Sequence, residues 1–119
     1  MSFEFNNQRP IYVQLVEQIK GLILSGEYKE REKLPSVREL ATEFSVNPNT
    51  MQKALAELET MGLIFTERTN GKYVNAAPEL VEQLKEEMAE EKTDDYLKEM
   101  KEIGYSCEET IEYLKRRRQ

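Results

Sequence analysis

Histidine is absent from this chain of 119 residues, and cysteine, proline and glycine are scarce, with one, four and five copies. Without histidine, a nucleophilic Cys107 has no usual base partner. The sequence also contains neither a Cys/His cluster with metal-ligand spacing nor a glycine-rich phosphate loop. We therefore expect a protein that is not an enzyme and that binds no metal and no cofactor. The few glycines and prolines argue against long loops and favour helices.

The sequence also lacks the segments that direct a chain to a membrane or out of the cell. No run of 18 apolar residues is present, and the opening MSFEFNNQRP has no basic segment followed by an apolar stretch. The single cysteine cannot form an internal disulfide, which agrees with a reducing compartment. We expect no membrane partner and a cytoplasmic location.

Negative charge is unevenly divided along the chain. The net charge is −6, but residues 1–77 hold 9 basic and 10 acidic side chains, a net of −1, whereas residues 78–119 hold 8 and 13, a net of −5. Because the local placement of charge decides whether phosphates can approach, the first part remains a candidate for nucleic-acid binding. The length suits one compact domain, residues 1–76, with an appendage, residues 77–119.

Three helices are predicted in the first domain. Pro10 opens the first of them, in which apolar residues recur every four positions. The second is predicted over Val37–Phe44, and Val37 is expected to be one of its buried apolar residues. Ser36 is its N-cap and Glu39 follows three residues later, which is the pattern of a capping box.

The segment SVNPNTMQKAL, residues 45–55, opens the third helix. Asn47 is a good N-cap, and Pro48 suits the first helical position, where its missing N–H is not needed. Val46 and Met51 have the spacing of a hydrophobic staple. Only about two residues separate this cap from the helix before it, which predicts a helix-turn-helix.

After Gly62, which is placed to end the third helix in a left-handed cap, the apolar period changes. Residues 63–66 and 72–74 are predicted to be strands, and Asn70-Gly71 between them is a strong hairpin signal because both residues tolerate a positive φ. A hairpin directly after a helix-turn-helix is typical of a winged helix. We therefore predict a mainly α fold with a small β-hairpin, in which an N-terminal winged helix-turn-helix precedes a short C-terminal helical dimerisation tail.

The tail is predicted to be helical and to form a homodimer. Thr93-Asp94-Asp95 is a point where its first helix can break or recap, and Ser106 with Glu109 opens a last helix that turns Ile111 and Leu114 inward. So short an amphipathic segment makes a poor globule alone, whereas packing on a second copy buries its apolar stripe. The expected dimer-interface residues are Leu80, Val81, Leu84, Met88, Tyr96, Leu97, Met100, Ile103, Ile111 and Leu114.

Two further features of the tail are interpreted without a function. Cys107, near the start of the last helix, is taken as a small, semi-buried residue. The final Arg116-Arg117-Arg118 is taken as a solvated end of the chain.

The uncovered face of the third helix is the candidate DNA-reading surface. Asn49 and Gln52 can form paired hydrogen bonds with adenine, Thr50 can contact thymine or a phosphate, and Lys53 can reach a phosphate or a guanine. The same residue types are also typical of solvated helix surfaces, so the preceding tight turn and the following hairpin are what favour DNA. Arg38, in the second helix, is a candidate phosphate clamp or fork on guanine, with a surface ion pair as the plainer alternative.

The run LPSVRELATEFSVNPNTMQKALAELETMGLIFTERTNGKYV, residues 34–74, closely resembles the winged helix of GntR-type bacterial transcription regulators. Residues 10–28, the VNPNT segment and the short tail with GYSCEETIEYL are similar to the YtrA-type branch of that family. The resemblance implies a homodimeric regulator, usually a repressor, that binds double-stranded DNA at an inverted-repeat operator. Members of this branch often control their own operon and transporter genes.

The resemblance also assigns DNA contacts to the arginine of the LPSxR run, to the start of the recognition helix and to the wing tip. In two respects this sequence departs from the pattern. Pro48 and Gln52 stand where many members have arginine, and Thr69 replaces the first of two wing glycines, so the base preference and the depth of the wing need not follow the family. Residues and resemblance together give the candidate DNA-binding residues Ser36, Arg38, Asn47, Pro48, Asn49, Thr50, Gln52, Lys53, Arg68, Thr69, Asn70, Gly71 and Lys72.

Alternatives remain open at the level of the sequence. A protein-interaction adaptor could reuse a winged helix, since an acidic surface repels DNA. The tail is too short to enclose a typical ligand pocket of about 300 Å³ or more, which leaves a small-molecule effector uncertain. The operator, the regulated genes and the choice between repressor and activator are not encoded in any visible motif.

Overall fold

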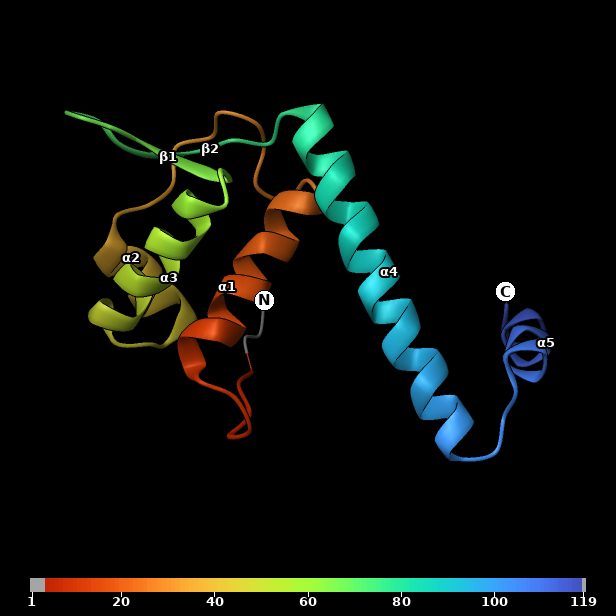
Figure 1. Cartoon of the computed structure of the whole chain (residues 1–119). Helices are drawn as coiled ribbons and strands as arrows, with labels where there is room; N and C mark the ends of the chain where they lie inside the picture. The colour runs from red at the N-terminus through yellow and green to blue at the C-terminus, as the bar shows by residue number, and fades with distance from the viewer. Residues whose placement is uncertain (1–3, 119) are drawn as a thin grey trace. The chain divides into compact units, whose positions relative to one another are not determined.

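The computed structural model of the chain describes residues 4–118 (Figure 1). Five helices and one hairpin follow each other along the chain. They are α1 (Ile11–Leu24), α2 (Val37–Phe44), α3 (Pro48–Thr60), β1 (Ile64–Glu67), β2 (Gly71–Val74), α4 (Pro78–Glu102) and α5 (Cys107–Arg117). The chain divides into two compact units, one ending at Val81 and one beginning at Glu82.

The core of the first unit lies between α1, α2, α3 and the base of the hairpin. The face of α1 that holds Leu15, Ile19 and Ile23 is fully buried, as its four-residue spacing predicts. Phe44 of α2 and Met51 of α3 are fully buried too, whereas Val37 is only half-buried. Each such side chain contributes about 1.5–3 kcal/mol by leaving water, so packing stabilises an α2 of only eight residues.

The predicted caps of α2 and α3 are confirmed. The Ser36 hydroxyl accepts from the Glu39 backbone N–H at 3.2 Å, and the Glu39 carboxylate accepts from the Ser36 N–H at 3.0 Å. At the start of α3 the Asn47 side chain accepts from the Asn49 N–H at 2.7 Å, and Pro48 occupies the first helical position. These local bonds fix where the two helices of the helix-turn-helix begin.

The turn between α2 and α3 depends on a left-handed residue that the sequence did not reveal. Ser45 has φ 58°, and the next N–H, that of Val46, bonds back to the Ala41 carbonyl at 2.9 Å. A single residue in this conformation reverses the chain at the end of α2, as glycine commonly does. Gly62 plays the predicted role at the end of α3, with φ 84° and a bond from the Leu63 N–H to the Leu58 carbonyl at 3.0 Å.

The predicted hairpin is confirmed, and its loop has three residues. Strands β1 and β2 are antiparallel, and Glu67 pairs with Gly71, which leaves three residues in the loop. The Asn70 N–H bonds to the Glu67 carbonyl at 3.3 Å, and only Gly71 takes a positive φ, of 106°. Of the two residues that tolerate a positive φ, the three-residue loop uses only Gly71.

A third extended segment, which the sequence did not indicate as part of the sheet, completes the wing. Lys33 forms an antiparallel bridge with Tyr73, and the Leu34 N–H bonds to the Lys72 carbonyl at 2.9 Å. The connection between α1 and α2 therefore lies along β2. It brings Lys33 and Pro35 beside the wing, about 40 residues away in sequence.

The second unit holds most of α4 and all of α5. The helix α4 continues through Thr93-Asp94-Asp95 without the break considered above, because the apolar positions after this segment keep helical spacing. It ends before Gly104, whose φ is 102°. The predicted capping box of α5 is confirmed, with the Glu109 N–H donating to the Ser106 hydroxyl at 3.1 Å and the Glu109 carboxylate accepting from the Ser106 N–H at 2.9 Å.

In the single chain, the expectations that Ile111 and Leu114 face inward and that Cys107 is semi-buried were wrong. Ile111 and Leu114 are 46% and 48% exposed, and Cys107 is exposed as well. The inward position belongs to Thr110, which is fully buried and donates its hydroxyl to the Ser106 carbonyl at 2.9 Å. A unit built from two helices has no third layer to cover the remaining apolar side chains.

Candidate nucleic-acid interface

The first two turns of α3 present a row of polar side chains. Asn49, Gln52 and Lys53 are exposed, and Thr50 is half-buried. All four lie in the first two turns of α3 because the cap at Asn47 fixes where the helix begins. Their opposite face, which includes Met51, lies in the core, so α3 is held rigidly while this row faces outward.

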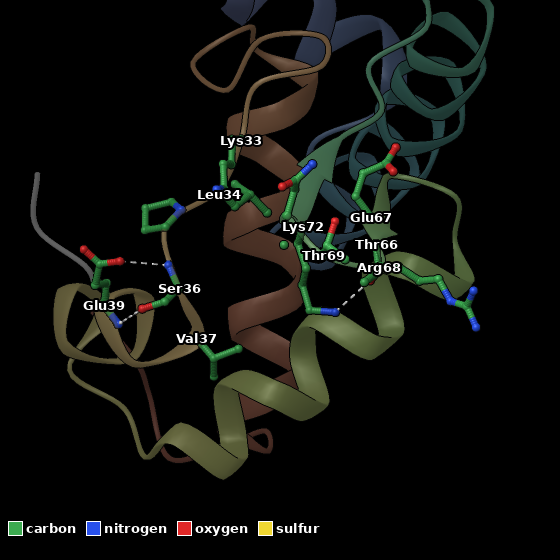
Figure 2. A pocket seen from close by; sticks show the side chains of 13 residues that line it. Lys33, Leu34, Ser36, Val37, Glu39, Thr66, Glu67, Arg68, Thr69 and Lys72 are labelled. Carbon is green, nitrogen blue, oxygen red and sulfur yellow. Dashed lines mark hydrogen bonds between the residues drawn. The ribbon is translucent and has the colours of Figure 1, made fainter.

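A hollow of about 770 Å³ lies between the wing and the start of α2 (Figure 2). We call it the wing groove. Its residues come from the segment before α2, from the start of α2 and from the hairpin. They are Lys33, Leu34, Pro35, Ser36, Val37, Glu39, Thr66, Glu67, Arg68, Thr69, Asn70, Gly71 and Lys72. The groove combines three cations and the two carboxylates of Glu39 and Glu67 with hydroxyl and amide groups. The cations, hydroxyls and amides are groups that can contact a phosphate backbone.

Glu39, one of the acidic residues of the wing groove, is already hydrogen-bonded to Ser36. The backbone N–H and the hydroxyl of Ser36 hydrogen-bond in the capping box and hold the pKa of the Glu39 carboxyl below its usual range. This carboxylate is thus ionised at neutral pH, and it points to the Ser36 backbone (Figure 2). Ser36 serves α2 first, as the sequence analysis expected.

The cationic side chains of the wing differ in their hydrogen bonds and ion pairs. The Lys72 ammonium donates to the Thr66 hydroxyl at 3.0 Å and lies 3.6 Å from the Glu59 carboxylate of α3. Among the ion pairs of residues 4–118, none includes Arg68 or Arg38. Figure 2 shows the Arg68 side chain directed away from Ser36, at the outer side of the hairpin.

Lys53 also has a partner, which comes from α1. Its ammonium lies 3.9 Å from the centroid of the Tyr12 ring, within the range of a cation–π interaction. Tyr12 is not among the DNA-binding residues predicted from the sequence. Its position in the first turn of α1 does not indicate a contact with Lys53, because that contact depends on how α1 packs on α3.

Thirteen candidate DNA-binding residues thus fall into two clusters and one isolated position. Six candidates lie at the cap and in the first two turns of α3, namely Asn47, Pro48, Asn49, Thr50, Gln52 and Lys53. Ser36 and residues 68–72 line the wing groove. Arg38 is exposed on α2 and does not line that groove. Lys33 lines it and was missed, although its place directly before LPSVR in the sequence was a usable signal.

A comparison with known families identifies the fold. The profile of the gntR family of bacterial regulatory proteins matches residues 11–74, which is more than half of the chain. The chain belongs to the GntR family. Its winged helix spans α1 to β2, so both clusters of candidate DNA contacts lie inside the matched region.

Two curated relatives of this GntR protein come from Bacillus subtilis strain 168. It is 37% identical over 115 residues to the uncharacterized HTH-type transcriptional regulator YhcF, covering 97% of this chain and 95% of that protein. It is 53% identical over 75 residues to the HTH-type transcriptional repressor YtrA, covering 61% of this chain and 58% of that protein. The expected similarity to YtrA-type regulators is confirmed.

Solved structures give the same result. A GntR family transcriptional regulator from Listeria monocytogenes superposes with a TM-score of 0.86 at 41% identity, covering 94% of this chain and 98% of that one. The structure of AraR(DBD) in complex with operator ORX1 superposes with a TM-score of 0.57 at 28% identity, covering 62% and 95%. The protein is thus a GntR-family transcriptional regulator with a winged-helix DNA-binding domain.

The candidate dimer residues of the GntR protein are partly exposed in the single chain. Tyr96, Ile103, Ile111 and Leu114 are exposed, while Leu80, Val81, Leu84, Met88, Leu97 and Met100 are half-buried. Val81 belongs to the first unit and lines a shallow hollow with Ile23 and Leu24 of α1. Within the second unit, an apolar groove is lined by Lys92, Thr93, Tyr96, Leu97, Cys107, Thr110, Ile111 and Leu114. The role of these residues in a dimer stays a prediction.

Among the described residues, no group of three or more histidine, cysteine or acidic side chains is arranged to hold a metal ion. In the same part of the chain, no helix combines the length and the apolar character needed to cross a membrane.

Proposed function

We propose that this protein is a homodimeric, cytoplasmic repressor that binds an inverted-repeat operator, at the promoter of its own operon with transporter genes. Each copy places α3 in the major groove of one half-site and the wing against the flanking backbone. Asn49, Thr50 and Gln52 then face base edges, and Arg68 with Lys33 faces phosphates. The role as a repressor is supported by the likeness to YtrA, which is itself named a repressor.

The observation on which this rests is the outward row of polar side chains on a rigid α3. An α-helix fits the major groove of B-form DNA, and residues of its first turns lie nearest the bases. Asn49 and Gln52 are amides in those turns, and they are exposed. The AraR(DBD) complex supports this placement, because that winged helix of similar fold is bound to its operator.

The homodimer is supported by the second unit. Its apolar groove contains exposed Tyr96, Ile111 and Leu114, which a single chain leaves in contact with water. Packing these side chains on a second copy removes apolar surface from water at about 25 cal/mol per Å². Two copies related by a two-fold axis also match two half-sites of an inverted repeat.

The test is selection of duplexes from a random pool by the purified protein, followed by affinity measurements at several salt concentrations. We expect one inverted-repeat sequence to emerge, with affinity that falls steeply as salt rises, because phosphate contacts release counterions. The Gln52→Ala variant should select a relaxed sequence at one position of each half-site, with a loss of about 1–3 kcal/mol of discrimination.

If Gln52→Ala selected the same sequences as the parent, Gln52 would not contact a base. Failure of the parent to enrich any duplex would contradict the proposed function and favour a protein-interaction adaptor.

A further inference from the structure

The contact between Lys53 and Tyr12 joins the reading helix to α1. The ammonium of Lys53 is 3.9 Å from the ring centroid, which is direct contact with the ring face. Lys53 is exposed and Tyr12 is half-buried, so the ring is fixed by the fold while the ammonium remains open to water on its other side. Among the ion pairs of residues 4–118, none includes Lys53, and its charge is therefore not offset by an acid.

The side of α3 on which Lys53 lies differs from that of Gln52. An open hollow beside the start of α3 is lined by Ile11, Tyr12, Asn49, Thr50 and Lys53. Lys53 is one turn after Asn49 on the face of α3 toward α1. Asn49 belongs to the first turn, where residues lie nearest the bases, whereas Lys53 lies one turn further from the start of the helix. Gln52 does not line this hollow, so Lys53 points to the flank of the reading helix.

The chemistry of an ammonium group allows both contacts at once. It has three N–H donors and no acceptor, and a ring face occupies only one side of it. The remaining donors can bind an anionic oxygen. A lysine side chain has large rotamer freedom when unheld, and the ring confines it before DNA arrives, which lowers the ordering cost of binding.

We propose that Tyr12 is a positioning residue of the DNA-binding surface: its ring holds the Lys53 ammonium at the flank of α3, where Lys53 binds a backbone phosphate and not a base edge. This inference rests on the proposed function, since it assumes that α3 docks in the major groove. It resolves the choice between phosphate and guanine that the sequence left open for Lys53.

A phosphate contact has a different signature from a base contact. Losing it weakens binding by a similar factor on every sequence and lowers the slope of log affinity against log salt by about 1. Lys53→Ala should show both effects on the selected operator and on operators with single base changes. Lys29→Ala, which removes an exposed lysine on the connection after α1, is the matched control and should leave affinity and slope unchanged.

The role of Tyr12 is tested by a double-mutant cycle with Lys53, using the full chain. Tyr12→Leu should weaken operator binding about two- to fivefold in the parent, since an exposed cation–π contact has that strength. The same change in a Lys53→Ala background should have no further effect. Tyr12→Phe keeps the ring and should bind as the parent does.

A measurement on the free protein accompanies the cycle. The Lys53 side-chain protons next to the ammonium should resonate upfield in NMR spectra because they lie over a ring, and they should lose this shift in Tyr12→Leu but keep it in Tyr12→Phe. Thermal unfolding of each variant shows whether the fold is intact. This readout tests the Tyr12–Lys53 contact without DNA.

Several results would overturn the proposal. An equal loss from Tyr12→Leu with and without Lys53 would show that Tyr12 does not act through Lys53, and a loss in Tyr12→Phe would show that the hydroxyl matters and not the ring. A Lys53→Ala effect confined to one base position would assign Lys53 to a base. A parent that selects no duplex would overturn the proposed function and this inference together, whereas the results above overturn the inference alone.

Discussion

At the scale of single residues, the wing illustrates that a cation in the right place is not always free to bind. Lys72 is held by the Thr66 hydroxyl and by the Glu59 carboxylate, and the same Glu59 accepts a hydrogen bond from Thr66. Arg68, four residues earlier, is exposed and has no ion pair within the described residues. Part of the charge of Lys72 is thus offset before any phosphate approaches.

This difference predicts unequal effects of two similar substitutions. Arg68→Ala should weaken operator binding more than Lys72→Ala. Glu59→Gln should tighten binding by about 1.4- to fivefold, because an exposed ion pair of about 0.2–1 kcal/mol no longer competes for Lys72. Fluorescence anisotropy with a labelled operator at low and high salt measures all three.

The matched control for Glu59→Gln is Glu57→Gln, which removes the same charge from α3 at an exposed position outside the described ion pairs. Equal tightening by both variants would show that general charge, and not release of Lys72, is responsible.

The sequence predicted local contacts of single residues better than distant ones. Ser36 with Glu39 and Asn47 with Asn49 were found because each pair is two or three residues apart. The contacts of Lys72 with Glu59 and of Lys53 with Tyr12 were not, because they join residues 13 and 41 positions apart through the packing of whole helices. The membership of the candidate list stays a prediction, and the sequence did not show that Lys72 and Lys53 already have partners within the fold.

At the scale of elements, helix ends were predictable and the shape of turns was not. Serine, asparagine and glycine mark helix ends by simple local bonding rules. Ser45 takes a left-handed conformation that serine seldom adopts, and Asn70 avoids one that asparagine tolerates. In both turns the backbone conformation depends on where the neighbouring elements lie. A short stretch of sequence does not contain that information.

The two capping boxes predict a dependence of helix stability on pH. Hydrogen bonds from Ser106 lower the pKa of the Glu109 carboxyl, as those from Ser36 do for Glu39. A carboxyl whose pKa is lower in the folded state stabilises the fold above its unfolded pKa, and that contribution is lost as the pH falls through the folded value. We expect the start of α5 to fray below about pH 4.

Carbon chemical shifts of residues 106–110, followed from pH 6 to pH 3, measure this fraying. Glu109→Gln should remove most of the pH dependence, whereas Glu108→Gln, a neighbouring exposed change outside the capping box, should preserve it. Parental pH dependence in Glu109→Gln would assign the effect to another group.

At the scale of the whole molecule, charge and apolar surface are divided between the two parts of the chain. The excess of negative charge lies in residues 78–119, while the buried core belongs to the first unit, apart from Thr110. The first part thus has the means to fold and to approach phosphates. The second has apolar side chains that its own two helices leave uncovered. The sequence placed both the acidic excess and the apolar stripe in residues 78–119, and the packing of that stripe on a second copy stays a prediction.

Removal of the second unit separates folding from dimerisation. A chain ending at Val81 should keep a cooperative thermal transition, because the first unit holds its own core. It should be a monomer by sedimentation and should bind the full operator at least tenfold more weakly than the parent, since the two half-sites are no longer engaged by one linked pair. A half-site duplex is the control, and on it the two proteins should differ little. A truncated chain that remains dimeric would place the interface in the first unit.

The extra segment at Lys33 has a consequence for how copies of this protein can meet. It covers one edge of β2, so within the described residues the sheet keeps a single open edge, β1. That edge is four residues long, and Thr66 and Glu67 are exposed on it. Short, charged margins of this kind are poor templates for adding further strands, which is how small sheets begin to form fibrils. The wing is therefore a poor site for strand-to-strand contacts between copies of this protein.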